Sequence, residues 1–540
     1  MTEQAPYKYT DTTGNQYEEL YDLSTEKTVE AIYRECYGDT GNPFVEALPP
    51  AKDVEEVFKA YSRAIFVPTQ KELASMSLYD RVTSLKELKR YRVPLPFHPA
   101  LEMEFHRALS ASYGHRVRKE NRTVNVNATI GNETVSYHGK TMIRNMSEVP
   151  EGFTLLGISG CGKSTAINML LEHYPQVIIH NKGTWKETIQ VTYLHVNCQP
   201  NSNFSTLYAA IGRELDNALG NLTPVYEEEV NKRTRLGVKK DYIRSLIEIF
   251  SIGILILDEI ELIDLSSTKE NSIETLLTLT NETGIALAAV GTIDAYESLF
   301  KKRRTARRMG VLIKASKYCE NKTQFSRVAK VLSFYQWREK KIEYTQDMID
   351  MLYKCSNGTI SDLVGIYSQI EKNYIMGSEK GEVTPKYIEK VANEYYEGLQ
   401  RINEKERNPV LADSRALTDD EVRAMNDFLA NSEMDELHRK YEEVMSRQDL
   451  ADYYQLEASV VIDVTRLYPK YRRSSIESTF RKIMEKETDS IIPLADAVAK
   501  TVAFLEMKEQ KKIEKEQVKK RNLLTADDMR RTLLGDEKAG

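Results

Sequence analysis

The middle of the chain alternates between short apolar runs and amphipathic stretches. Strand-like runs lie over 153–158, 176–180, 191–198, 253–258, 284–292 and 311–315. Continuous aliphatic runs such as Ile254-Leu255-Ile256-Leu257 are typical of parallel strands that are buried on both faces. Several of the segments between the runs carry apolar residues at helical spacing. The pattern therefore predicts an α/β core in which helices cover a parallel sheet.

The chain on either side of this core is mostly helical in pattern. Apolar or aromatic residues recur at helical spacing over 26–37, 53–66 and 99–113. Residues 41–50 instead read as an extended peptide bounded by prolines, which is either a linker or a segment lying in a groove. Two further helical regions are predicted, and a polar linker over 401–413 separates them. They cover 320–398 and 417–510.

A β-hairpin is predicted at the entry to the core. Residues 123–130 alternate at period two, Gly131-Asn132 is a turn signal, and Val135-Ser136-Tyr137 resumes the strand pattern. A basic run, 116–122, precedes the hairpin. This run either contacts phosphates or is the solvated base of the hairpin.

The strongest chemical signal is the stretch from Gly157 to Ser164, which reads G-x-x-x-x-G-K-S. This pattern between a strand and a helix is a phosphate-binding P-loop, because glycines let backbone N–H groups and a helix N-terminus approach phosphate oxygens. Lys163 is expected to neutralise the β- and γ-phosphates, whereas Cys161 is a small spacer. The predicted nucleotide-binding residues are Gly157, Ile158, Ser159, Gly160, Cys161, Gly162, Lys163, Ser164 and Thr165.

Acidic residues follow the aliphatic run over 253–257. Asp258 and Glu259 therefore stand at the carboxyl end of a buried parallel strand, where α/β folds place their ligands. We expect Asp258 and the Ser164 hydroxyl to hold Mg²⁺, and Glu259 to polarise the attacking water. Thr292 ends the next strand, and it either contacts the γ-phosphate or the water, or caps the following helix.

Two basic segments stand out in an acidic chain. The first, 231–240, contributes Lys232, Arg233, Arg235, Lys239 and Lys240. The second, 301–308, holds six basic residues in eight and has three interpretations. It supplies an arginine finger to a neighbouring subunit, contacts DNA phosphates, or is a solvated helix end. The finger candidates are Arg303, Arg304, Arg307 and Arg308.

Composition narrows the class of protein. The 540 residues carry a formal charge of −6, so nucleic-acid binding requires local basic patches rather than a global positive field. Five scattered cysteines without a CxxC pair argue against a zinc site or a disulfide framework. The sequence has neither an apolar run of transmembrane length nor the apolar core of a signal peptide, so we expect a cytosolic protein without membrane contact.

The whole set of motifs resembles the AAA+ class of P-loop proteins and, within it, the TnsC family of transposition regulators. MuB and TniB are more distant relatives of this kind. The segments that carry the resemblance span roughly residues 30–370. They are 42–50, 157–165, 174–178, 257–260, 290–292 and 306–308. Residues 42–50 are the most specific to the TnsC family, which favours a structured segment over a linker there.

The resemblance implies a fold and a division of the chain. It implies an AAA+ P-loop three-layer α/β/α core with a parallel five-stranded sheet, a helical lid, and helical N- and C-terminal extensions. The expected regions are a selector-binding N-terminal region, the nucleotide-binding core, the lid, and a transposase-binding C-terminal region. Their bounds are 1–120, 121–320, 321–400 and 401–540.

The resemblance also implies a function. TnsC-like proteins use ATP and Mg²⁺, bind double-stranded DNA in the ATP state, and form rings or filaments around it. They link a target-selector protein to transposase subunits in the bacterial cytosol. The basic residues over 232–240 would then face DNA phosphates. The tail over 523–534 is either a partner-docking segment or a frayed terminus.

One position departs from a pattern common in AAA+ proteins. Many of them carry a lid arginine in a G-x-x-R motif, whereas this chain has Gly358-Thr359-Ile360-Ser361. The serine predicts slow, switch-like ATP hydrolysis. Two alternative functions remain open at this point: a helicase loader or replication initiator, and a signalling P-loop NTPase that binds no DNA.

Overall fold

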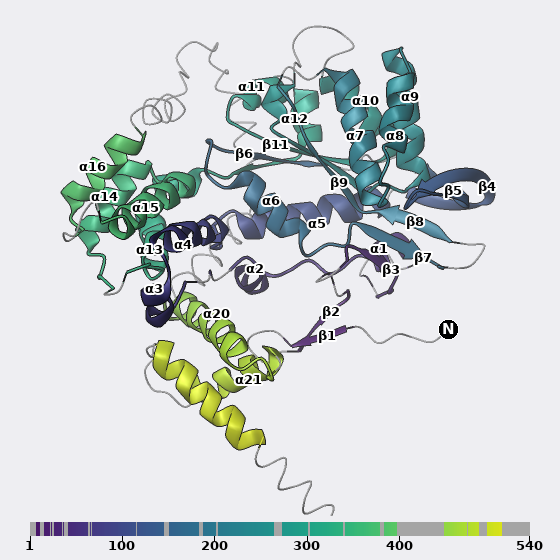
Figure 1. Cartoon of the computed structure of the whole chain (residues 1–540). Helices are drawn as coiled ribbons and strands as arrows, with labels where there is room; N and C mark the ends of the chain where they lie inside the picture. Colours follow the sequence, from purple (N-terminus) through teal and green to yellow (C-terminus); the bar gives the residue numbers. More distant parts are fainter. Residues whose placement is uncertain are drawn as a thin grey trace, which may run out of the picture. The chain divides into compact units, whose positions relative to one another are not determined.

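The structure of the chain is a computed structural model, which divides into two compact units (Figure 1). One unit comprises Met1–Tyr7 and Glu19–Ser446, and the other comprises Lys8–Glu18 and Arg447–Gly540. The residues that the structure describes are 7–10, 16–21, 23, 26–34, 36, 41–62, 65, 67–114, 116–144, 151–182, 187–200, 203–263, 273–300, 303–338, 341–377, 383–396, 448–471, 473–484 and 494–509.

Five parallel strands form the central sheet of the larger unit, in the order β12-β6-β11-β10-β9. Alternate residues of these strands enter two different apolar cores. Ile254 and Ile256 of β10 pack into one core, whereas Leu255 and Leu257 pack into the other. Burial on both faces explains the continuous aliphatic runs of the sequence. The strands are β6 (Phe153–Leu156), β9 (Tyr193–Asn197), β10 (Ile254–Asp258), β11 (Ala286–Gly291) and β12 (Val311–Lys314).

Helices cover both faces of this sheet, which confirms the expected three-layer α/β/α core (Figure 1). The first face packs against α5 (His98–Gly114) and α6 (Lys163–Leu171). Six helices follow strands β9, β10 and β11 in the chain, and apolar residues of each join the core under the second face. They are α7 (Phe204–Ala218), α8 (Val225–Lys232), α9 (Leu236–Ile249), α10 (Ile273–Thr283), α11 (Ala295–Phe300) and α12 (Arg303–Met309).

The helix predicted over 26–37 is wrong. Residues Thr28–Glu30 form strand β3, which pairs in parallel with β7 (Val177–His180). With β8 (Thr188–Val191), these strands make a separate three-stranded sheet, so the run over 176–180 lies outside the central sheet. Backbone pairing with β7 overrides the helical spacing of the side chains, because the strand's hydrogen bonds depend on a partner 149 residues away in the chain.

The strand predicted over 191–198 is interrupted. Strand β8 ends at Val191 and β9 begins at Tyr193, so that one belongs to the small sheet and the other to the central sheet. The break falls at Thr192, whose hydroxyl donates to the Pro175 carbonyl. A single apolar run therefore serves two sheets.

The proline-bounded segment over 41–50 is neither extended nor a linker. Pro43–Glu46 form the short helix α1, whose first turn is capped by the Asn42 side chain accepting from the Phe44 N–H at 3.1 Å. Phe44 is buried and stacks on Tyr113 of α5 with ring centroids 5.7 Å apart. The segment is therefore part of the apolar core that packs against the first face of the central sheet.

Residues 54–114 are mostly helical, as predicted, and lead into the hairpin. The hairpin strands β4 (Arg116–Ile130) and β5 (Glu133–Arg144) confirm the predicted β-hairpin. Its turn is fastened to the α7–α8 loop, since Asn132 Oδ1 accepts from the Leu222 N–H at 2.9 Å. The N-terminal elements are α2 (Val54–Ala60), α3 (Gln70–Ser75), α4 (Leu78–Ser84) and the 3₁₀ helix η1 (Leu85–Arg90).

Helices follow the core in the order that the pattern over 320–398 predicts. Trp337 is fully buried among them, and its indole N–H donates to Ser84 Oγ at 2.7 Å, so it joins this bundle to α4. Asn357, with a left-handed φ of 52°, ends one helix before the next begins. The elements are η3 (Lys317–Glu320), α13 (Lys322–Ser333), α14 (Gln346–Ser356), α15 (Ile360–Ile375) and α16 (Pro385–Tyr396).

A buried ion pair holds this lid bundle together. Arg338 Nε donates to Glu371 Oε1 at 2.7 Å, with only 3% and 0% of the side chains exposed. The Glu371→Ala variant would leave the Arg338 charge buried without its partner, so we expect a loss of about 3–5 kcal/mol in unfolding free energy. Chemical denaturation would measure it. The exposed pair Lys354–Glu389 is the control, because Lys354→Ala should change stability by less than about 1 kcal/mol.

The smaller unit contains helices α20 (Gln448–Leu467) and α21 (Arg473–Met484) and a third helix over 494–509. Val460, Phe480 and Leu505 contribute to its apolar core. Strands β1 (Tyr7–Thr10) and β2 (Gln16–Glu19) form a two-stranded sheet. The linker predicted over 401–413 and the tail over 523–534 lie outside the described residues. Among the described residues, every helix is too short or too polar to span a lipid bilayer.

Candidate functional site

The P-loop connects β6 to α6 at the carboxyl end of the central sheet. Its shape depends on its glycines. Gly162 precedes α6 with a left-handed φ of 99°. A Cβ atom on Gly157 would lie 2.8 Å from Cys161 Sγ and 3.0 Å from the Ser316 backbone nitrogen. The buried Cys161 thus fills space behind the loop, as expected of a spacer.

Lys163 and Ser164 stand at the mouth of the loop. Lys163 Nζ donates to the Gly157 and Ile158 carbonyls at 2.9 and 3.1 Å, so its charge lies across the opening. The Ser164 hydroxyl hydrogen-bonds the Asp258 carboxylate, which joins the P-loop to the end of β10. The structure therefore brings together the two residues that we predicted as Mg²⁺ ligands.

Asp258 is buried, with 2% of its side chain exposed, and it remains suited to holding a cation. Burial raises the pKa of this carboxyl, but hydrogen bonds from His195 and Ser164 outweigh the burial and bring the pKa below its ordinary value. His195 Nε2 lies 3.4 Å from Asp258 Oδ2. An ionised carboxylate beside a hydroxyl is a set of hard oxygen ligands that fits Mg²⁺, which keeps several waters and needs few protein ligands.

Glu259 follows Asp258 in a left-handed backbone conformation, with φ of 56°. Such a conformation is strained for a residue with a side chain and is characteristic of functional sites. Its exposed side chain lines the cavity in front of the P-loop. Glu259 therefore lies in the same cavity as the P-loop residues, and its predicted role as a general base stays a prediction.

Thr292 does not cap the helix that follows it. Its hydroxyl is buried and has no hydrogen-bond partner among the described residues, although it lines the same cavity. Its backbone N–H donates to Glu261 Oε2 at 3.1 Å. Sequence reasoning missed Glu261, which holds Thr292 in place. Glu261 is the third acidic residue after the apolar run, two residues beyond Glu259. This closeness to the other two acids could have identified it as a site residue.

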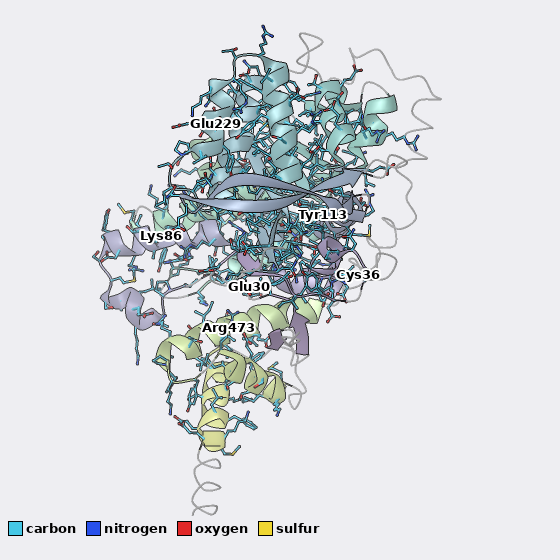
Figure 2. All side chains as sticks on the ribbon, turned by 90° about the vertical axis from the view of Figure 1, so that its right-hand side faces the viewer. Glu30, Cys36, Lys86, Tyr113, Glu229 and Arg473 are labelled. Carbon is cyan, nitrogen blue, oxygen red and sulfur yellow. The ribbon has the colours of Figure 1, made fainter. Side chains whose placement is uncertain are left out.

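A cavity of about 840 Å³ unites these groups. Its walls also include parts of the chain that sequence reasoning did not assign to the site. The N-terminal element η1 and the segment after it form one wall, where Lys86 is labelled in Figure 2. Helix α15 of the lid forms another. The lining residues that we predicted are Ser159, Gly160, Gly162, Lys163, Ser164, Thr165, Asp258, Glu259 and Thr292.

The lid helix begins directly against the P-loop. The Ser361 N–H donates to the Gly160 carbonyl at 3.2 Å, and a Cβ on Gly160 would lie 2.9 Å from Ser361 Cβ. The cavity-lining face of α15 continues through Val364 and Gly365 to Lys372. A serine thus occupies the position at which many AAA+ proteins place a phosphate-sensing arginine.

The arginine segment over 303–308 forms α12, away from this cavity. Arg307 is exposed and Arg308 is half-buried, and neither lines the cavity of its own chain. The side chains of Arg303 and Arg304 lie outside the described set. The described arginines therefore do not line the nucleotide cavity of their own chain. An arginine finger acts on a neighbouring subunit, so it does not need to reach the cavity of its own chain.

The basic segment over 231–240 is not a loop. It contains the end of α8 and the start of α9, with a turn between them. Lys239 is buried and donates to Ser205 Oγ at 2.8 Å, so it is withdrawn from the surface. Lys240 pairs with Glu282 at 3.1 Å. Lys239 therefore lacks the exposed cationic group that a phosphate contact needs, whereas Lys240 keeps 21% of its side chain exposed.

The remaining three basic residues cluster around the turn. Lys232 is 64% exposed and pairs with Glu229, which is labelled in Figure 2. Arg233 pairs with the same carboxylate and stacks over the Tyr242 ring at 3.7 Å. Arg235 is exposed just before α9. Lys232 and Arg235 are therefore the members of the predicted set that remain accessible.

Comparison with known proteins gives a family match over the residues that contain the P-loop and the end of β10. Residues 150–299 match the family model described as an AAA domain. The comparison with curated proteins found no match. The central sheet, the P-loop and the acidic end of β10 together define a P-loop domain of the AAA+ class.

Among solved structures, Cdc6p from Pyrobaculum aerophilum is 18% identical over 43% of this chain, with a TM-score of 0.29. The chain spans 57% of the length of that protein. A chain in the structure of Drosophila ORC bound to DNA is 11% identical over 66% of this chain and 73% of its own, with a TM-score of 0.30.

Proposed function

We propose that this protein is an ATP-hydrolysing switch that binds duplex DNA in its ATP state and regulates DNA transposition. The observation that carries the ATPase part is the convergence of Lys163, Asp258, Glu259 and Thr292 on one cavity beside the P-loop. The transposition part rests on the sequence resemblance to the TnsC family. The buried helix α1 supports it, since the segment most specific to that family is part of the folded core.

In this proposal the chain's own groups contribute to hydrolysis by positioning the reactants and stabilising charge. The loop N–H groups and Lys163 bind the phosphates of ATP, while Ser164 and Asp258 would hold Mg²⁺, which supplies positive charge to the phosphate oxygens when bound. Glu259 orients the attacking water and accepts its proton. The Thr292 hydroxyl donates to the γ-phosphate or to that water. The Glu261 carboxylate accepts from the Thr292 backbone N–H and so holds this residue in position.

Assembly completes the proposed switch. An arginine of α12 would reach the nucleotide of the neighbouring subunit in a homo-oligomeric ring or filament. Oligomers would surround DNA in the cytosol, with the N-terminal region toward a target selector and the C-terminal region toward transposase subunits. The serine at position 361 suits slow turnover, because the first turn of α15 brings an acidic residue, Asp362, and no positive charge toward the phosphates.

Two exposed cations carry the proposed DNA contact. The double variant Lys232→Glu/Arg235→Glu should weaken duplex binding at least tenfold at about 0.1 M salt and reduce the salt dependence, because each phosphate contact contributes about −0.9 to the log–log slope. Fluorescence anisotropy with random-sequence duplexes would measure both quantities. Because the contacts are to phosphates, the loss should not depend on base sequence.

A matched control separates this patch from total charge. Lys322→Glu/Lys354→Glu also reverses two exposed charges, both on the lid, where Lys322 is 53% exposed and Lys354 is 69% exposed. This change should leave DNA affinity within about twofold, since the lid lies on the other side of the nucleotide cavity. Equal losses in the patch variant and the control would contradict a DNA-binding surface on α8 and α9.

A further inference from the structure

Two walls of the nucleotide cavity carry positive charge. Lys86 and Lys89 of η1 and Arg92 just after it line the cavity, and Lys372 of α15 lines it from the lid. Among the described residues, every charged side chain that lines the cavity from these two walls is a cation. The acidic lining residues all lie at the end of β10 or just after it. The proposed mechanism of hydrolysis gives these four cations no role.

The repeat of the 3₁₀ helix directs the lysines of η1 toward the cavity. Such a helix has three residues per turn, so residues three apart share a face. Lys86 and Lys89 are exposed and lie on a face that lines the cavity. Glu87 and Arg90 share another face, which does not line the cavity, and pair with each other at 3.3 Å. The one acid of η1 is thus engaged elsewhere, and in the described part of the chain no carboxylate pairs with either lysine.

Packing holds this charged face in place. Leu88 of η1 is buried, and the Tyr91 hydroxyl at the end of η1 donates to the Val328 carbonyl of the lid at 2.9 Å. Further along the segment, Leu95 Cδ1 lies 3.7 Å from the position that a Cβ atom would take on Gly162. The element that carries the lysines is therefore fixed both to the lid and to the P-loop.

Walls of this charge favour one class of ligand. A cavity wall of a single sign focuses the electric field and attracts ligands of the opposite charge. The first turn of α15, beside the P-loop, carries Asp362 and no basic residue, so it does not supply such a field. With Mg²⁺ bound to both nucleotides, ATP keeps a greater negative charge than ADP. A positive wall therefore stabilises bound ATP more than bound ADP.

We propose that Lys86, Lys89, Arg92 and Lys372 form a cationic wall that attracts the phosphates of the nucleotide and makes η1 an element that distinguishes ATP from ADP. The inference rests on the proposed function, which places the phosphates at the P-loop of the same cavity. The N-terminal region then contributes directly to the ATP state on which the proposed DNA binding depends.

Removing two charges of the cationic wall tests this inference on the full-length protein. Lys86→Ala/Lys89→Ala should weaken ATP binding about tenfold but ADP binding only about threefold at about 0.1 M salt, because the interaction scales with the charge of the ligand. The losses should shrink at about 1 M salt, where the screening length falls to about 3 Å. Equilibrium titration of both nucleotides with Mg²⁺ present would give the dissociation constants.

Lys71→Ala/Arg90→Ala is the matched control. It also removes two exposed cations from the N-terminal region, neither of which lines the cavity. Both nucleotide affinities of this variant should stay within about twofold of the wild type. Unchanged ATP affinity in Lys86→Ala/Lys89→Ala, equal losses for ATP and ADP, or the same losses in the control would overturn the inference. A loss of duplex affinity without a loss of ATP affinity would also overturn it, since the lysines would then contact DNA.

The two proposals fail in different ways. If the wild-type protein binds no nucleotide, the proposed function fails and the cationic wall fails with it. If ATP binds and Lys163→Ala abolishes that binding, but Lys86→Ala/Lys89→Ala keeps the wild-type preference for ATP over ADP, only the role of η1 is overturned. Both lysines are exposed, so their replacement by alanine leaves the apolar core intact.

Discussion

Replacing Glu259 by glutamine is expected to lower ATP turnover by a factor of roughly 10²–10⁴ while leaving ATP binding intact. Glu259 lines the cavity in a left-handed backbone conformation, next to the buried Asp258. Glutamine keeps the shape of the side chain but cannot accept a proton from the attacking water. Steady-state phosphate release and equilibrium binding of ATP, measured on the same preparation, would separate the two effects.

Glu261→Gln is the matched control for this variant. Glu261 lies two residues away and its carboxylate accepts the Thr292 N–H, a role that the amide oxygen of glutamine can retain. Turnover in the control should therefore fall much less than in Glu259→Gln. Turnover in Glu259→Gln within a few-fold of the wild type, or equal losses in both variants, would show that Glu259 is not the base.

Removal of one particular arginine of α12 is expected to lower ATP turnover by a factor of about 10³–10⁵, because an arginine finger stabilises the charge that develops on the transferred phosphoryl group. Alanine substitution at Arg303, Arg304, Arg307 and Arg308, one at a time, should identify it. ATP binding should persist in the variant that loses turnover. Measurements on assembled protein with duplex DNA are required, because the described arginines lie away from their own cavity.

Mixing variants tests whether the finger acts between subunits. A subunit with Glu259→Gln keeps its arginines, and a subunit without the finger keeps Glu259. Mixed oligomers should therefore contain some complete sites and regain part of the lost turnover, which neither variant shows alone. Four alanine variants with turnover near that of the wild type would instead favour a solvated helix end or a DNA-contacting patch.

The central sheet could be predicted because its signals are local. A strand such as β10 is buried on both faces, so its continuous aliphatic run can be recognised in the sequence without knowledge of the neighbouring strands. The P-loop and the acids after β10 are likewise contiguous in sequence. Their meeting through the Ser164–Asp258 hydrogen bond follows from the parallel sheet, which places both at the same edge.

The errors concern segments whose conformation depends on distant partners. Strand β3 exists because it pairs with β7, and α1 is buried because Phe44 packs on Tyr113. Neither partner is visible from the local pattern. The cavity walls from η1 and α15 were missed for the same reason.

The basic segment over 232–240 shows how charge alone misleads. A count of basic residues gave five equal DNA-contact candidates, but Lys239 is buried against Ser205 and Lys240 pairs with Glu282. Sequence cannot distinguish an exposed lysine from one that is engaged by a distant helix. The structure removes Lys239 from the surface and leaves Lys232 and Arg235 as the most exposed candidates, with Arg233 held against Tyr242 and Lys240 partly exposed.

Nucleotide-gated DNA binding is the central claim, and a salt titration tests it most directly. Duplex affinity would be measured with ADP, ATP and a non-hydrolysable ATP analogue, for the wild-type protein and Lys163→Ala. We predict tight binding only with ATP or the analogue, a log–log salt slope of about −0.9 per phosphate contact, and no such binding by the variant. Absence of duplex binding in every nucleotide state, or equal binding with ADP and ATP, would contradict the claim.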